Sequence, residues 1–122
     1  MKYMLNKNII YFYILAIFVI SLIPSVSIIG EIQSFGIDKV FHLVEYFILG
    51  VLTYFFIKNR RKLFKIVYIL IALVPIVDEY LIQRISGRTI DVWDFIFNII
   101  GLYLGTSILF LIYRYRDKKT DN

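Results

Sequence analysis

Several ionisable and amide side chains of this chain recur at helical spacings. Asp38, His42 and Glu45 are separated by four and three residues, which places them within about 60° of one face of a helix. Asp94 and Asn98 are also four residues apart. Carboxylates and an imidazole can act as general acids or bases, bind a cation or hydrogen-bond to one another. We therefore expect these two groups to belong to one polar site.

A third polar group precedes a short turn. Glu79 and Gln83 share a helix face, and Asp78 lies about 100° around the same helix. Arg84 and Arg88 follow in and after the turn. If three helices bring their polar faces together, this group would meet the first two at one end of the molecule.

The elements that must position these residues are apolar helices. Hydrophobic residues make up 60% of the 122 residues and the mean hydropathy is +0.76, more than a water-soluble core of this size can bury. A helix needs roughly 20 residues to cross the hydrocarbon, and four apolar stretches approach that length. The sequence predicts an all-α membrane protein, a compact bundle of four transmembrane helices. We expect one domain over residues 1–122, with helices at roughly residues 8–26, 38–57, 63–83 and 91–114.

The charge distribution predicts the topology. Eleven of the fourteen lysines and arginines lie in the N-terminal tail, in the segment 58–65 and in the C-terminal tail, and seven of the nine acids lie on the other side. By the positive-inside rule both termini are cytoplasmic, in a multi-pass protein of the plasma membrane. The net charge of +5 then reflects topology and contact with anionic lipid. We expect no nucleic-acid partner. With one histidine and no cysteine, the sequence also argues against haem and thiolate metal chemistry.

Individual residues predict where these helices begin, bend and pack. Asp38 and Asp91 are predicted N-caps of the second and fourth helices. Pro75 should interrupt the third helix next to Asp78 and Glu79. The spacing Gly101-x-x-x-Gly105 favours close approach of another helix. Tyr46 is expected among aromatic residues at the outer membrane interface.

Burial of these charges in lipid has a cost that constrains the arrangement. A carboxylate at the bilayer centre costs on the order of 2.5–3.5 kcal/mol, and less near the interface. Four acids, Glu45, Asp78, Glu79 and Asp94, must therefore face one another, water or cations. The available cations are Lys39, Arg84, Arg88 and, when protonated, His42. Such a cluster would be close to neutral, so a purely structural role as interhelical support remains open.

The motifs together resemble the VanZ-like family of small integral membrane proteins. The resemblance covers nearly the whole chain. It is carried by Ser21-Leu22-Ile23-Pro24, Asp38-Lys39-x-x-His42-x-x-x-Tyr46-x-x-Leu49-Gly50, Asp78-Glu79-x-x-x-Gln83, Gly87-Arg88 and Asp91-x-x-Asp94-x-x-x-Asn98-x-x-Gly101. Bulky Ile90, Val92 and Trp93 stand where small residues are common. The resemblance implies an association with resistance to glycopeptides of the teicoplanin type. It also marks these positions for testing: Asp38, Lys39, His42, Asp78, Glu79, Gln83, Arg88, Asp94 and Asn98.

The leading expectation is an outward-facing polar pocket that binds a lipid or lipid-linked cell-envelope precursor and so influences glycopeptide susceptibility, with chemical modification of that lipid left open. The candidate ligand-binding residues are Asp38, Lys39, His42, Gln83, Arg84, Arg88 and Asn98. The catalytic candidates are His42, Glu45, Asp78, Glu79 and Asp94. No cofactor is predicted, although Mg²⁺ held by Asp78, Glu79 and Asp94 is an open alternative. Whether the chain is an enzyme stays open.

Two other function classes remain. The first is a small transporter or proton relay, in which the carboxylates and His42 pass a proton or cation. Apolar segments 47–52 and 66–77 offer no polar path to the cytoplasm, although an oligomer could build one between subunits. The second is a structural, partner-binding membrane subunit.

Overall fold

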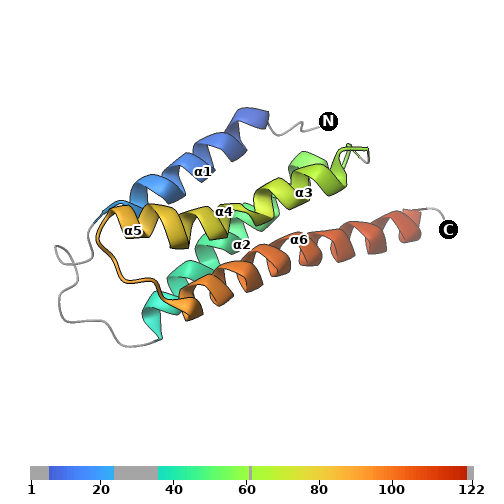
Figure 1. The fold of residues 1–122 in the computed structure, drawn as a ribbon. Coiled ribbons are helices and arrows are strands. Elements are labelled where there is room, and N and C mark those ends of the chain that lie inside the picture. The colour runs from blue at the N-terminus through green and yellow to red at the C-terminus, as the bar shows by residue number, and fades with distance from the viewer. Residues whose placement is uncertain (1–5, 24–35, 61, 121–122) are drawn as a thin grey trace.

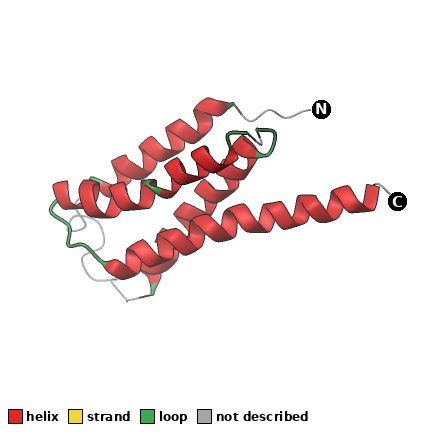
Figure 2. Cartoon of the chain, turned by 45° about the vertical axis from the view of Figure 1, so that its right-hand side comes forward, coloured by secondary structure: helices red, strands yellow, loops and turns green. Residues whose placement is uncertain are grey.

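The computed structural model describes residues 6–23, 36–60 and 62–120, and all its regular elements there are helices (Figures 1 and 2). This confirms the all-α fold class for the described part of the chain. The elements are α1 (Lys7–Ser21), α2 (Ile37–Ile57), α3 (Phe64–Ala72), α4 (Val74–Val77), the π-helix η1 (Asp78–Ile82), α5 (Gln83–Ile85) and α6 (Val92–Thr120).

Three described helices are long and apolar enough to cross a membrane. They are α2, the continuous run from Phe64 to Ile85, and α6. The apolar part of α1, Asn8–Ser21, is shorter than these. Its expected extension to residue 26 reaches past residue 23, outside the described residues. The structure therefore establishes three candidate spans and one shorter apolar helix, whereas the sidedness of the termini stays a prediction.

The helices run antiparallel in turn, which separates two chemically different ends. The start of α1, the turn between α2 and α3, and the end of α6 lie together at one end (Figure 1). We call this the basic end, after the cations of segment 58–65 and of residues 114–119. The start of α2, the end of α5 and the start of α6 lie at the other. We call that the acidic end, after Asp38, Asp91 and Asp94.

The main packing contact of the bundle joins α2 to α6 and depends on glycine. A Cβ atom built on Gly101 would overlap the carbonyl oxygen of Leu43, and one on Gly105 would overlap that of Phe47. Gly50 makes the reciprocal approach from α2, against the backbone of α6. The predicted close approach at Gly101 and Gly105 is confirmed. It draws the two backbones together along several turns.

The remaining helices pack around this pair. Ile17 of α1, Leu49 of α2, Ile71 of α3 and Leu102 of α6 are buried in one apolar cluster. The Tyr13 hydroxyl donates to the Glu45 carbonyl at 2.8 Å, which ties α1 to α2. Large apolar side chains also cover the outer faces of all the long helices. Such surfaces suit lipid contact, because lipid is as apolar as these side chains.

The two predicted helix caps had different outcomes. Asp91 caps α6, since its Oδ1 accepts the backbone N–H of Trp93 at 2.8 Å. The cap assigned to Asp38 was wrong, because α2 already begins at Ile37, after Gly36. Asp38 is therefore the second residue of the helix, and no described side chain caps the N-terminus of α2. Asp38 instead projects along α2 toward the residue one turn later.

The third span is irregular on both sides of Pro75. A single turn residue, Leu73, separates α3 from α4, but its backbone stays helical (φ −77°, ψ −20°), and Pro75 occupies the first turn of α4. The next turn is the π-helix η1, in which Asp78 and Glu79 are both fully buried. A π turn contains one residue more than an α turn, so it can direct consecutive side chains to different neighbours.

Alanine at Gly105 should destabilise the bundle. The added methyl group would force the α2 and α6 backbones apart, at a cost of about 1–3 kcal/mol that outweighs the helix preference of alanine. The matched control is Gly36→Ala, since a Cβ atom there meets nothing within 4 Å. Thermal unfolding in detergent should show a lower midpoint for Gly105→Ala and little change for Gly36→Ala. Equal midpoints would contradict the close packing described here.

Candidate functional site

A buried ion-pair cluster at the acidic end centres on Lys39. Its side chain is only 7% exposed, and its Nζ contacts Asp94 Oδ1 directly. The same Nζ lies 2.5 Å from Asp91 Oδ2 and 3.5 Å from Asp38 Oδ2. Lys39 and Asp38 come from α2, whereas Asp94 comes from α6 and Asp91 from its cap. One lysine thus neutralises carboxylates from two helices.

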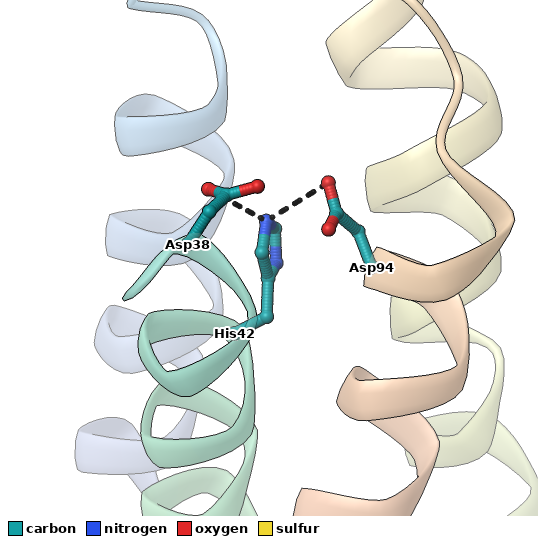
Figure 3. A group of neighbouring side chains, drawn as sticks. All are labelled: Asp38, His42 and Asp94. Carbon is teal, nitrogen blue, oxygen red and sulfur yellow. Dashed lines mark ion pairs between the residues drawn. The ribbon is translucent and has the colours of Figure 1, made fainter. Parts of the chain in front are cut away.

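His42 lies one turn further along α2, between Asp38 and Asp94 (Figure 3). Its Nε2 is 3.4 Å from Asp94 Oδ2 and 3.8 Å from Asp38 Oδ1. Its Nδ1 lies 3.0 Å from Asn98 Oδ1, in the buried interface with α6. The imidazole is therefore oriented from both sides by side chains of α2 and α6.

These contacts define what the imidazole can do. When Asn98 Oδ1 accepts the Nδ1 proton of His42, the other ring nitrogen, Nε2, faces two carboxylates. In that position Nε2 either carries a proton or coordinates a cation. Asp38, His42 and Asp94 each offer one ligand atom, all within 4.8 Å of one another. This group differs from the expected Mg²⁺ set, because Asp78 and Glu79 point elsewhere. Mg²⁺ prefers oxygen ligands alone, whereas an imidazole favours transition metals and zinc.

Asp78 connects α2 to the third span. Its Oδ2 accepts the Tyr46 hydroxyl proton at 2.9 Å, and both residues are fully buried. Ser21, in α1, lies within electrostatic range of this carboxylate, whose Oδ1 has no hydrogen-bond partner among the described residues. The expectation that Tyr46 lies in an aromatic belt was wrong. Tyr46 follows His42 by one helical turn and shares its inward face, so its hydroxyl serves the polar cluster.

Glu79 connects the third span to α6. Its Oε2 accepts from Gln83 Nε2 at 2.7 Å, which confirms that these residues share a helix face. Its Oε1 accepts the backbone N–H of Asp91 at 3.0 Å. Asp91 in turn caps α6 and pairs with Lys39. Glu79 therefore holds the start of α6 in position through the same residue that contacts the lysine.

The two arginines have different environments. Gly87 adopts a left-handed φ of 76°, and the Arg88 N–H donates to the Gln83 carbonyl at 3.1 Å, which closes the turn after α5. This turn leaves Arg88 half-buried and within electrostatic reach of Glu45 and Asp78. Arg84 is exposed. The structure thus adds Arg88 to the cluster and leaves Arg84 at its rim.

The three polar groups predicted from sequence converge, but with a different set of charged residues. Asp38 and Asp91 join the acids around Lys39, and Arg84 does not counter them. Among the described residues, six carboxylates face Lys39, Arg88 and His42. These carboxylates are Asp38, Glu45, Asp78, Glu79, Asp91 and Asp94. Counted by residue, the cluster therefore holds two more acids and one cation fewer than expected, while its net charge stays a prediction.

The sequence-based site also omitted three participants: Tyr46, Asp91 and Ser21. Helical spacing could have identified two of them. Tyr46 is four residues after His42, and Asp91 is three residues before Asp94. Ser21 gave no such signal, because it lies on α1, whose other residues are almost all apolar.

Replacement of Lys39 by methionine should destabilise the protein strongly. It leaves Asp91 and Asp94 without their cation, and loss of one partner of a buried pair costs about 3–5 kcal/mol. Adding Asp94→Asn should recover part of this loss, because it removes one uncompensated charge. Chemical or thermal unfolding of the single and double variants measures the coupling, with Lys119→Met at an exposed position as control. Additive effects of the two substitutions would contradict the pairing.

The chain was compared with known proteins. The family model described as VanZ/LLP1 matches residues 3–113, which is most of the chain and includes every member of the acidic cluster. Neither the search of curated proteins nor the search of solved structures gave a match. Three candidate membrane spans and the motif-bearing acidic end agree with the family match. The chain is a member of the VanZ/LLP1 family of membrane proteins.

Proposed function

We propose that this VanZ/LLP1 protein binds the phosphate-bearing head group of a lipid or lipid-linked cell-envelope precursor at its acidic end. Binding would occur in the outer leaflet of the plasma membrane, with both termini cytoplasmic. By holding or altering such a precursor, the protein would change how much of a glycopeptide's target is exposed. The lipid is then its principal partner.

The observation that carries this proposal is the environment of Arg88. Arg88 is half-buried and lies within electrostatic range of Glu45 and Asp78. Yet within residues 6–23, 36–60 and 62–120 it forms no ion pair with either carboxylate. A cation and carboxylates that face one another without direct pairing suit a ligand with both an anionic group and hydrogen-bond donors.

A phosphorylated, hydroxyl-bearing head group has this chemistry. Arg88 would bind the phosphate, bidentately where geometry permits, and exposed Arg84 would attract it from the rim. Hydroxyl or amino groups would donate to Glu45. Asn98 is fully buried, and its Nδ2 has no hydrogen-bond partner among the described residues, so it supplies a donor to the same ligand. Gln83 already donates a hydrogen bond to Glu79, so Asn98 is the amide that would bind hydroxyl groups of the ligand.

If a chemical step follows binding, the base we propose is Glu45. His42 Nε2 faces two carboxylates and Nδ1 contacts Asn98, so its proton is held within the cluster. Glu45 is half-buried at the open side of the cluster, near Arg88. A carboxylate in that position can accept a proton from a ligand hydroxyl.

One observation favours the alternative, in which the polar residues only hold the helices together. The contacts of Lys39, Tyr46 and Glu79 each join two helices, as structural polar residues do. These residues cannot separate the two functions, because their loss would also weaken the bundle. Arg88 and Glu45 can, since their side chains do not bridge helices in the described structure.

Arg88→Ala should weaken lipid retention without unfolding the protein. A hydrogen bond to a charged group contributes about 1.5–3 kcal/mol, so retention should fall roughly 10- to 100-fold. Native mass spectrometry of protein released from nanodiscs of bacterial lipid extract measures the lipid that stays bound. Arg116→Ala removes the same charge from the basic end and should retain wild-type binding. Unchanged lipid retention in Arg88→Ala, or an equal loss of retained lipid in both variants, would contradict the proposal.

In cells, Arg88→Ala and Glu45→Gln should each abolish any effect of the protein on teicoplanin susceptibility. The measurement is the minimum inhibitory concentration in a strain that expresses each variant, with protein level followed by immunoblotting. Arg116→Ala serves as the matched control. If the effect on teicoplanin susceptibility falls only as far as the amount of protein falls, the residues have a structural role instead.

A further inference from the structure

A second site lies at the opposite end of the molecule. A cavity of about 680 Å³ opens between the turn after α2, the start of α3 and the last turns of α6. It shares no residue with the acidic cluster. Its lining includes five cations: Lys58, Lys62, Lys65, Arg114 and Lys118. Asp117 is the single acid among its lining residues, so the site is strongly positive.

The cavity is also walled by aromatic rings. Tyr54 and Tyr113 lie 5.5 Å apart between ring centroids, and the Lys58 ammonium lies 5.1 Å from the Tyr113 centroid. This contact holds the Lys58 charge at the wall of the cavity. Cations over aromatic walls at a membrane boundary form a binding site for an anionic, amphiphilic group.

An apolar groove continues from this cavity toward the middle of the span. The groove has a volume of about 280 Å³ and shares Tyr54, Phe64 and Phe110 with the basic cavity. Beyond these residues it extends to Tyr103 and Ser107 on α6. It exists because α6 packs along α2 and reaches α4, while its contact with α3 is sparse. A charged cavity that leads into an apolar groove matches a phosphate head group followed by an acyl chain.

We propose that this combined cavity and groove binds one anionic phospholipid from the leaflet that meets the basic end. The lysines and Arg114 hold the phosphate and any second anionic group, and the acyl chain lies along α6 past Ser107. Zwitterionic lipids carry their own cation into a site with five positive groups, so they should bind less well. This site is independent of the head-group site proposed at the acidic end.

The test uses the full chain in nanodiscs that contain equal amounts of phosphatidylglycerol and phosphatidylcholine. Native mass spectrometry of the released protein should show preferential retention of phosphatidylglycerol. Lys62→Gln combined with Lys65→Gln should reduce that retention about tenfold or more, since each cation near an anionic lipid contributes on the order of 1 kcal/mol. Both side chains are exposed, so the fold should persist, as circular dichroism would verify.

The matched control removes two charges from the same end but outside the cavity lining. Arg60→Gln combined with Lys119→Gln should leave retention unchanged. Ser107→Phe, which fills the groove without changing charge, should lower retention as the lysine variant does. Equal loss in both double variants would show a general surface attraction and overturn the site. Equal retention of both lipids, or displacement of phosphatidylglycerol by inorganic phosphate, would overturn it as well.

Failure here can be told apart from failure of the acidic-end proposal. Arg88→Ala should remove only the lipid held at the acidic end, so the phosphatidylglycerol whose retention depends on Lys62 and Lys65 should stay bound. If Arg88→Ala instead removes the retained phosphatidylglycerol while the lysine variant keeps it, the lipid belongs to the acidic end, and the basic-end site is excluded.

Discussion

The close approach of α2 and α6 is the constraint on which the acidic cluster depends. Side chains at Gly50, Gly101 or Gly105 would separate the two backbones. Lys39 and His42 lie on the same helix as Gly50, and their partners lie on the same helix as Gly101. Because the helices are in contact over several turns, short carboxylate and amide side chains reach across the interface. Packing that contributes no chemistry therefore sets the geometry of the charged residues.

The lipid surrounding is a second constraint, because it requires the buried carboxylates of the third span to have partners. Buried carboxylates in an apolar surrounding require partners. Tyr46 donates to Oδ2 of Asp78, whose Oδ1 has no hydrogen-bond partner among the described residues, and Glu79 pairs with Gln83 and the Asp91 backbone. These partners lie on different sides of the third span. The two consecutive acids reach them because the surrounding helices converge on this turn, so the polar contacts also fix where α2 and α6 sit.

The sequence predicted the fold class and the convergence of three polar faces well, because both follow from periodicity. Apolar runs indicated spans, and residues four apart, such as Glu79 and Gln83, were correctly placed on one face. The sequence could not predict which side chains pair across two helices. Spacing along one helix says nothing about which neighbour a side chain meets, so the pairing of Lys39 with Asp91 and the number of acids in the cluster were missed. Arg84 and Arg88 could not be told apart before the left-handed turn at Gly87 oriented them.

The π turn at Asp78–Ile82 has a consequence for how this chain can change in length. A π turn is equivalent to an α-helix with one residue inserted. Deleting a residue there would restore an ordinary α turn and leave the residues after it close to their present faces. A deletion in the α-helical part of the span, by contrast, would rotate everything after it by about 100°. Relatives of this protein should therefore tolerate the loss of one residue within Asp78–Ile82 better than a loss within α3.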